Sequence, residues 1–239
     1  PIIWMSTIAG LATTLGCILV LFFGRPQEKV LATLMAGAGG VMISVVVLDL
    51  LPTAVEIGSR SQVLLGFALG FFFMAVADRA LNSSSPSLPL SRRQRLKRVG
   101  ILVAAGIALH DLPEGMAISM GQEAAGELGL LIAIAITLHN LPEGMATAIP
   151  LQMAGVRKWK IILLNLGIAF FTPLGAIIGL LAVGAIENSL PIFLAFAAGA
   201  MTFLVIGELW PLSRERHPNY ALMGGVVGFC FFALISSFF

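Results

Sequence analysis

Charged side chains are scarce in this sequence of 239 residues: Asp, Glu, Lys and Arg make up only 11% of it, whereas 58% is hydrophobic. A soluble domain of this length carries about a quarter charged residues. The chain therefore has too little polar surface to cover a water-soluble globule, and a lipid bilayer must cover the remainder. The net charge of only +2 gives no reason to expect a nucleic-acid partner.

Cysteine is almost absent as well. Cys17 and Cys230 lie in apolar runs near opposite ends of the chain. This placement predicts two small buried hydrophobic side chains, and it argues against a disulfide or a pair of thiolate metal ligands. The sequence starts at Pro1 and not at methionine, which predicts a trimmed N-terminus and leaves residues before Pro1 open.

The apolar runs are close to twenty residues long, which favours membrane-spanning helices over the roughly ten-residue strands of a barrel. We therefore predict an all-α integral membrane protein with eight transmembrane helices in a single transporter domain, 1–239. Polar breaks separate the predicted spans: 2–23, 30–51, 62–80, 99–120, 127–150, 160–183, 190–211 and 219–238.

Basic residues are distributed unevenly among these breaks. Thirteen of the 14 lysines and arginines fall on alternate breaks, and only Arg60 lies on the other side. The positive-inside rule then places both termini on the extracytoplasmic side. The stretch 82–98 is predicted to be a basic cytoplasmic loop, an orientation signal that contacts lipid headgroups.

Two adjacent predicted spans repeat one motif. The sequence HDLPEGMA begins at His110 and HNLPEGMA begins at His139, so seven of eight positions are identical. The two spans run in opposite directions and each motif starts about midway along its span. Both motifs are therefore expected at the same depth, near the bilayer centre.

Ionisable groups at that depth are costly, about 2.5–3.5 kcal/mol for a charged residue, and they usually mark a functional site. The motifs place five there: His110, Asp111, Glu114, His139 and Glu143. The four-residue spacing of His and Glu puts both on one helix face, where they can share an ion. Asp111 and Asn140 lie about 100° further round the helix and could serve an adjacent position.

The ligand set narrows the choice of ion. Imidazole, carboxylate and amide groups suit Zn²⁺, Fe²⁺, Mn²⁺, Cd²⁺ or Co²⁺ better than Cu⁺, and imidazoles argue against a dedicated Ca²⁺ or Mg²⁺ site. Pairing between the two His/Glu sets without a metal remains the alternative. Gly115 and Gly144 are expected to let another helix approach closely, and Pro113 and Pro142 to kink the spans.

A weaker match joins the second and seventh spans without gaps: Gly40, Met42, Asp49 and Pro52 align on Gly199, Met201, Glu208 and Pro211. Because those spans run in opposite directions, we interpret the match as no simple inverted repeat, and local similarity alone can account for it. Repeats with broken helices at a midplane site are nevertheless typical of transporters.

At these residues the chain resembles the Zrt/Irt-like (ZIP) family of divalent metal transporters, particularly its shorter bacterial members. The resemblance covers nearly the whole chain and implies import of zinc, or of Cd, Fe, Mn or Co, through the bacterial inner membrane by an elevator-like homodimer. No permanently bound cofactor is implied. The metal ligands that it implies are His110, Asp111, Glu114, His139, Asn140, Glu143 and Met42.

Other residues are implied as parts of the metal route. Asp49 and Glu208 resemble carboxylates that line it. Thr172 replaces a glutamate that many members carry before the proline of the sixth span, which puts a second metal position in doubt. Asn165, two turns earlier, is a candidate amide ligand. The 82–98 stretch lacks the histidines often found there, so no metal-sensing role is expected for it.

Two other classes of function compete with transport. An intramembrane metal-dependent hydrolase needs about three protein ligands, an open coordination position and a general base. The histidines and glutamates just meet that count, but no further side chains are set out for a substrate, so we do not expect an enzyme. The third possibility is a proton-conducting or structural membrane protein that uses the histidines as relays.

Overall fold

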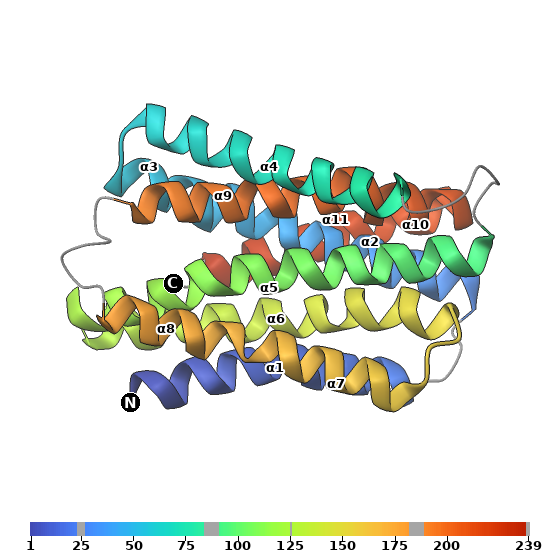
Figure 1. Ribbon diagram of the computed structural model, residues 1–239, viewed down its shortest axis with the longest axis horizontal. Coiled ribbons are helices and arrows are strands. Elements are labelled where there is room, and N and C mark those ends of the chain that lie inside the picture. The colour runs from blue at the N-terminus through green and yellow to red at the C-terminus, as the bar shows by residue number, and fades with distance from the viewer. Residues whose placement is uncertain (23–26, 84–90, 125, 182–188, 238–239) are drawn as a thin grey trace.

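The computed structural model of the protein describes residues 1–22, 27–83, 91–124, 126–181 and 189–237. Every regular element in these residues is a helix, and the helices lie roughly along one long axis (Figure 1). Six described helical runs are long and apolar enough to cross a membrane, and a shorter apolar helix covers Pro218–Leu234. Together with helix α6 (Gly126–Met153) they confirm an all-α membrane protein with the predicted order of passes.

The first four passes are α1 (Ile2–Phe22), α2 (Glu28–Val45) continued by η1 (Val46–Leu50) and α3 (Leu51–Ile57), α4 (Arg60–Ser83), and α5 (Arg92–Ala124). The last four are α6, α7 (Lys158–Ala169) continued by α8 (Phe171–Leu181), α9 (Leu190–Phe203) continued by η2 (Leu204–Leu209) and α10 (Trp210–Arg216), and α11 (Pro218–Ser236). The segments η1 and η2 are π-helical turns inside α-helical passes. Such turns are frequent at functional sites.

The stretch 82–98 differs from the predicted loop. Helix α4 continues to Ser83 and α5 begins at Arg92, while 84–90 lie outside the described residues. The reason is a capping box that the prediction missed. The Ser91 hydroxyl accepts a hydrogen bond from the Gln94 backbone N–H at 3.3 Å, and the Gln94 side-chain oxygen accepts one from the Ser91 N–H at 2.9 Å. These reciprocal bonds satisfy free donors at the helix start and extend α5 through its arginines.

The helices form two bundles that lie one above the other in Figure 1. The motif bundle consists of α1, α5, α6, α7 and α8, in which α6 packs on α1 and α5, and α8 packs on α5. The flanking bundle consists of α2, α3, α4, α9, α10 and α11 with η1 and η2. In it, α11 packs along α2 and α4 packs along α9. Helices α2 and α6, and α5 and α9, meet between the bundles.

The match between the second and seventh passes extends to their backbone conformation. Both passes carry a π-helical segment at the aligned place, and they run in opposite directions, as the halves of an inverted repeat do (Figure 1). The aligned glycines play the same role. A Cβ at Gly40 would lie 2.1 Å from a backbone oxygen of α11, and one at Gly199 would lie 2.1 Å from a backbone oxygen of α4.

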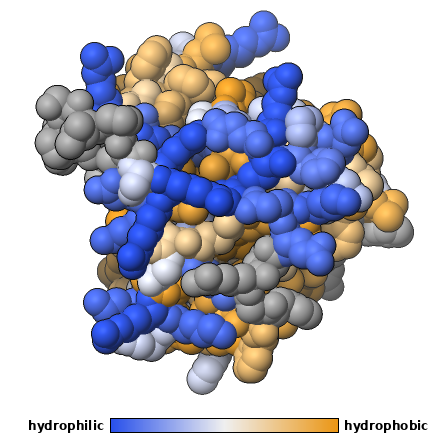
Figure 2. All heavy atoms as spheres, turned by 90° about the vertical axis from the view of Figure 1, so that its right-hand side faces the viewer, coloured by the Kyte–Doolittle hydropathy of each residue, from blue (hydrophilic) through white to orange (hydrophobic). Residues whose placement is uncertain are grey.

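The two ends of the molecule differ in polarity. The end seen in Figure 2, where α4 and α6 finish and α2 and α5 begin, is covered with hydrophilic side chains. The described lysines and arginines other than Arg60 belong to the helix ends gathered there. Both chain termini lie toward the opposite end (Figure 1). By the positive-inside rule, the basic end is cytoplasmic and the termini are extracytoplasmic.

The two cysteines have different environments. Cys17 is buried, as predicted, whereas Cys230 is exposed on α11 and was wrongly expected inside. Apolar side chains on the outside of a membrane bundle face lipid, so hydrophobic surroundings in the sequence do not separate the core from the lipid surface.

Candidate metal centre

The two motifs lie in the interior of the motif bundle, on neighbouring helices. Helix α5 continues through Pro113 and α6 continues through Pro142, so neither proline ends its helix. The polar side chains of both motifs are buried, with at most 3% of their surface exposed: His110, Asp111, Glu114, His139, Asn140 and Glu143. Burial of so many ionisable groups requires that they satisfy one another or bind an ion.

Each histidine contacts the glutamate of the other motif. Nε2 of His110 lies 3.1 Å from both carboxylate oxygens of Glu143. Nε2 of His139 lies 3.1 and 3.2 Å from the carboxylate oxygens of Glu114. The spacing within one helix predicted that His and Glu of each motif lie on one face, where both can reach the same ion, and pairing between the two sets was the alternative. The actual pairs cross between α5 and α6 and join the two motifs into one centre.

The second nitrogen of His110 is also held. Nδ1 of His110 donates a hydrogen bond to the Gly106 carbonyl at 3.1 Å. A carbonyl can only accept, so Nδ1 carries a proton and Nε2 faces the centre. This is the arrangement of metal-binding histidines, whose outer N–H fixes the ring and the tautomer. The edge of Phe232 packs against the His139 ring at 5.8 Å between centroids.

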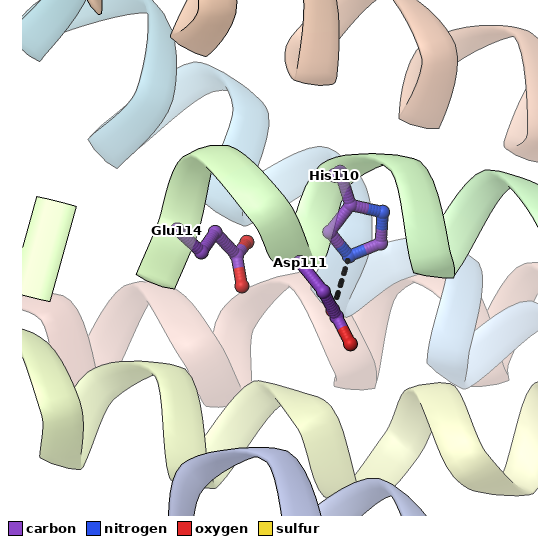
Figure 3. A group of neighbouring side chains, drawn as sticks. All are labelled: His110, Asp111 and Glu114. Atoms are coloured by element: carbon purple, nitrogen blue, oxygen red, sulfur yellow. Dashed lines mark ion pairs between the residues drawn. The ribbon is translucent and has the colours of Figure 1, made fainter. Parts of the chain in front are cut away.

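Asp111 is the least satisfied polar group of the centre. It is fully buried, and neither carboxylate oxygen has a hydrogen-bond partner in the described structure. Oδ1 of Asp111 lies 3.6 Å from Nε2 of His110, and the two side chains point to the same space beside Glu114 (Figure 3). One ligand atom from each of these three residues lies within 4.8 Å of the others. A buried carboxylate without donors fits a cation, and this donor set fits a divalent transition metal.

Apart from Asp111, the residues predicted to contribute to a second position are buried and neutral. Asn140 donates a hydrogen bond to the Ala9 carbonyl of α1 at 2.9 Å, which leaves its side-chain oxygen without a partner. Asn165 donates to the Ile161 carbonyl, and its oxygen is likewise without a partner. The Thr172 hydroxyl is fully buried and also lacks a partner. These groups offer neutral oxygens, not carboxylates.

Two of the residues predicted from the second pass lie in different surroundings. Met42, on α2, is fully buried in the apolar core of the molecule. Asp49, in η1, lines a cavity of about 280 Å³ that reaches Glu114 and His139. Asp49 accepts a hydrogen bond from the Ser236 hydroxyl at 2.9 Å, and Ser236 also lines the cavity. The cavity connects Asp49, on the side of the chain termini, with the buried centre.

Glu208 lies toward the cytoplasmic end, away from that cavity. One of its oxygens lies 2.9 Å from Nη2 of Arg98, and the same nitrogen lies 3.1 Å from Asp78. The prediction did not include Asp78, Arg98, Phe232 or Ser236. The four-residue spacing of Phe232 and Ser236 on the last pass was the available signal for a shared helix face.

The motif glycines bring two other helices against the centre, as predicted. A Cβ at Gly115 would lie 1.9 Å from the Thr172 carbonyl oxygen, and one at Gly144 would lie 1.7 Å from the Thr13 carbonyl oxygen. One further glycine completes each contact: Gly175 packs against Leu112, and Gly16 packs against Leu141. The same glycine contact thus joins α5 to α8 and α6 to α1.

A polytopic helical protein with a buried His/Asp/Glu centre, reached by a cavity from one side, has the architecture of an ion transporter. The comparison with known proteins agrees with this class. The model of the family described as "ZIP Zinc transporter" matches residues 86–236. The chain belongs to this family, and the protein is therefore not an enzyme.

Curated relatives cover nearly the full chain. The zinc transporter ZupT of Salmonella heidelberg (strain SL476) is 34% identical over 230 residues, which are 90% of this chain and 87% of the relative. The zinc transporter ZupT of Xanthomonas axonopodis pv. citri (strain 306) is 33% identical over 240 residues, 93% of this chain and 88% of the relative.

Proposed function

We propose that the protein transports divalent transition-metal ions, zinc foremost, across the bacterial inner membrane toward the cytoplasm. The observation that carries this proposal is the pair of crossed His/Glu contacts beside the unsatisfied Asp111 carboxylate, all buried in the bundle interior. The names of the relatives, zinc transporters, support zinc as the ion. The ion is cargo, and no resident cofactor is needed.

The ligands that we assign to the transported ion come from both motif helices. Nε2 of His110 and of His139 would bind it together with carboxylate oxygens of Glu114 and Glu143. Asp111 is the fifth donor, because its oxygens face the same space. When an ion enters, each His–Glu contact is broken, and the histidine nitrogen and the glutamate oxygen each bind the metal instead. Imidazole and carboxylate ligands at about 2.0–2.2 Å are the ordinary environment of zinc.

We assign secondary roles along the metal route to the remaining predicted residues. Asn140, Asn165 and Thr172 offer neutral oxygens for a second, weaker position, and the buried Met42 is assigned as a further ligand from the second pass. Asp49 attracts cations at the mouth of the cavity, and Glu208 lies at the cytoplasmic end. The whole chain, 1–239, forms one transporter domain, and two copies assemble in the membrane.

Flux measurements test the proposal directly. Purified protein in liposomes should carry Zn²⁺ and Cd²⁺ inward down their gradients, measured with an entrapped fluorescent metal indicator, and should not carry Ca²⁺ or Mg²⁺. Liposomes without protein are the control. Proton flux without metal flux would instead support a relay function for the histidines.

We expect Thr172→Glu to change metal affinity or selectivity. The substitution adds a carboxylate where the Thr172 hydroxyl is buried without a partner, so a second cation position gains charge. The measurement is competition between Zn²⁺, Cd²⁺ and Mn²⁺ in the flux assay. Thr172→Val is the matched control, since it keeps the shape without the charge. Identical ion competition in Thr172→Glu, Thr172→Val and the wild-type protein would show that position 172 takes no part in ion binding.

Uptake should also fall as the external solution is acidified. Imidazole and carboxylate ligands bind metal in their deprotonated forms, so protons compete with the ion. We expect the initial rate of uptake to decline as the external pH is lowered. Initial rates at pH 5.5 to 8 and fixed free Zn²⁺, held by a metal buffer, measure it. Faster uptake at acidic pH would indicate proton coupling instead of competition.

A further inference from the structure

Three arginines on the first turns of α5 reach across to the flanking bundle at the cytoplasmic end. Arg92 contacts Glu28 of α2 at 2.7 Å, and Arg95 contacts Glu215 of α10 at 2.7 Å. Arg98 contacts both Glu208 of η2 and Asp78 of α4, at 2.9 and 3.1 Å. The three-residue spacing places the arginines along one side of the helix.

All four of these ion pairs cross the boundary between the bundles. Each arginine belongs to the motif bundle, and each carboxylate belongs to the flanking bundle. The neighbouring Arg93 differs, because its Nε donates to the Ala154 carbonyl, directly after the end of α6, at 2.6 Å and so within the motif bundle. Arg92, Arg95 and Arg98 therefore form a distinct row, which is here called the arginine row.

The arginine row lies opposite the open route to the centre. All the ligands assigned to the ion belong to α5 and α6 of the motif bundle, and the cavity that reaches them runs from Asp49, toward the side of the termini. The row joins the bundles at the other end, the end that faces the viewer in Figure 2 and is covered with hydrophilic side chains. The centre is thus approached from outside while ion pairs hold the cytoplasmic end together.

We propose that the arginine row is a cytoplasmic lock: its ion pairs hold the two bundles together and keep the cytoplasmic side of the metal centre closed while the outer cavity is open. Release of the ion inward then requires these pairs to separate. The inference rests on the proposed transport function and deepens it by naming the residues that regulate inward opening.

The pairs differ in strength according to their exposure. The Arg92–Glu28 side chains are 68% and 51% exposed and the Arg95–Glu215 side chains 45% and 53% exposed, so water screens both pairs. Arg98, Asp78 and Glu208 are 17%, 22% and 8% exposed. Loss of Arg98 would leave two carboxylates with little water and no row cation between them. Arg98 is therefore the main element of the lock, and the outer pairs are readily broken and remade.

The test measures opening without depending on transport. Leu102 is fully buried one turn beyond Arg98, on the face of α5 where a Cβ at Gly106 would lie 2.2 Å from Leu204 of η2. Leu102→Cys in a Cys17→Ala, Cys230→Ala background reports access to the bundle boundary just inside the row. Inside-out membrane vesicles expose the cytoplasmic end, and a membrane-impermeant maleimide measures the labelling rate.

We expect Arg98→Gln and Arg95→Glu each to raise the labelling rate, by about threefold or more. Adding Glu215→Arg to Arg95→Glu should return the rate to that of the parent, because the swap restores the ion pair. Lys97→Glu, the same charge change at an exposed site on the same helix, should leave it unchanged. Unchanged labelling in both arginine variants, or a swap that does not restore the parent rate, would overturn the lock.

Zinc uptake by the same proteins in liposomes separates the two proposals. If the parent protein carries no metal while labelling responds as expected, the transport function fails and the lock stands. If the parent carries metal and labelling does not respond, transport stands and the ion pairs only anchor α5.

Discussion

Replacing Glu143 by glutamine should abolish zinc uptake. Both oxygens of Glu143 face Nε2 of His110 at 3.1 Å, in a fully buried position. The amide keeps the volume of the side chain but removes the charge, and it binds zinc poorly compared with a carboxylate. Loss of a residue that only hydrogen-bonds a ligand already costs about 10–100-fold in metal affinity, and loss of a direct ligand should cost at least as much.

The measurement pairs uptake by proteoliposomes with zinc binding by calorimetry on the purified protein. Glu56→Gln is the control, because Glu56 is an exposed carboxylate of α3 outside the cavity lining. His139→Ala should resemble Glu143→Gln, since it removes the partner of Glu114 in the other crossed pair. Undiminished uptake in both Glu143→Gln and His139→Ala would refute the assigned centre.

The sequence predicted the architecture well because hydropathy and charge are one-dimensional properties. Runs of about twenty apolar residues must be helices in a bilayer. The structure confirms this class, the order of the passes and the burial of both motifs. The predicted close approach at Gly115 and Gly144 is confirmed too. Small residues in membrane helices commonly mark the places where two helix backbones pack closely, so this contact could be predicted from one helix alone.

The sequence did not predict which side chains of different helices contact one another. The spacing of His110 and Glu114 describes one helix alone, whereas the actual partner of His110 is Glu143, which depends on the relative rotation of α5 and α6. The length of the second pass was underestimated for a related reason. The second pass continues through η1 to Ile57, although Asp49 and Pro52 are poor residues for a membrane helix. Contacts with neighbouring passes make up for these local costs.

The arginines of α5 show the same limit. Their charge predicted the cytoplasmic end, but it also led us to predict a loop where the structure has the first turns of α5. The capping box at Ser91 and Gln94 was visible in the sequence and outweighs the dense charge that follows. Once Arg92–Arg98 is helical, the three-residue spacing of its arginines becomes meaningful, and their carboxylate partners lie on α2, α4, η2 and α10.

The two bundles contribute different groups to the proposed metal route. The motif bundle holds the proposed ligands, while the flanking bundle supplies Asp49 on the outer side and Glu208 on the cytoplasmic side. An ion bound by the proposed ligands on α5 and α6 would therefore have a carboxylate of the flanking bundle on each side of it. The integrity of the motif bundle is therefore as important as the ligands themselves.

The Gly144→Ala substitution should show this by destabilising the protein and stopping uptake together. The added Cβ would lie 1.7 Å from the Thr13 carbonyl oxygen and 2.9 Å from the Cys17 backbone nitrogen, so α1 must move away from α6. Overpacking typically costs about 1–3 kcal/mol, and contact with the rigid backbone of α1 justifies about 3 kcal/mol here. Displacing α1 also disturbs the bond from Asn140 to Ala9 beside the centre.

Gly167→Ala provides the matched control, because a Cβ there would meet nothing within 4 Å although the residue lies in α7 of the same bundle. Alanine at an open helical position should stabilise the protein by up to about 1 kcal/mol through helix propensity. Thermal unfolding in detergent and uptake by proteoliposomes measure both variants. Equal stability for Gly144→Ala and Gly167→Ala would show that α1 and α6 are not held in direct backbone contact. A destabilised Gly144→Ala with normal uptake would show that this contact supports the fold without shaping the centre.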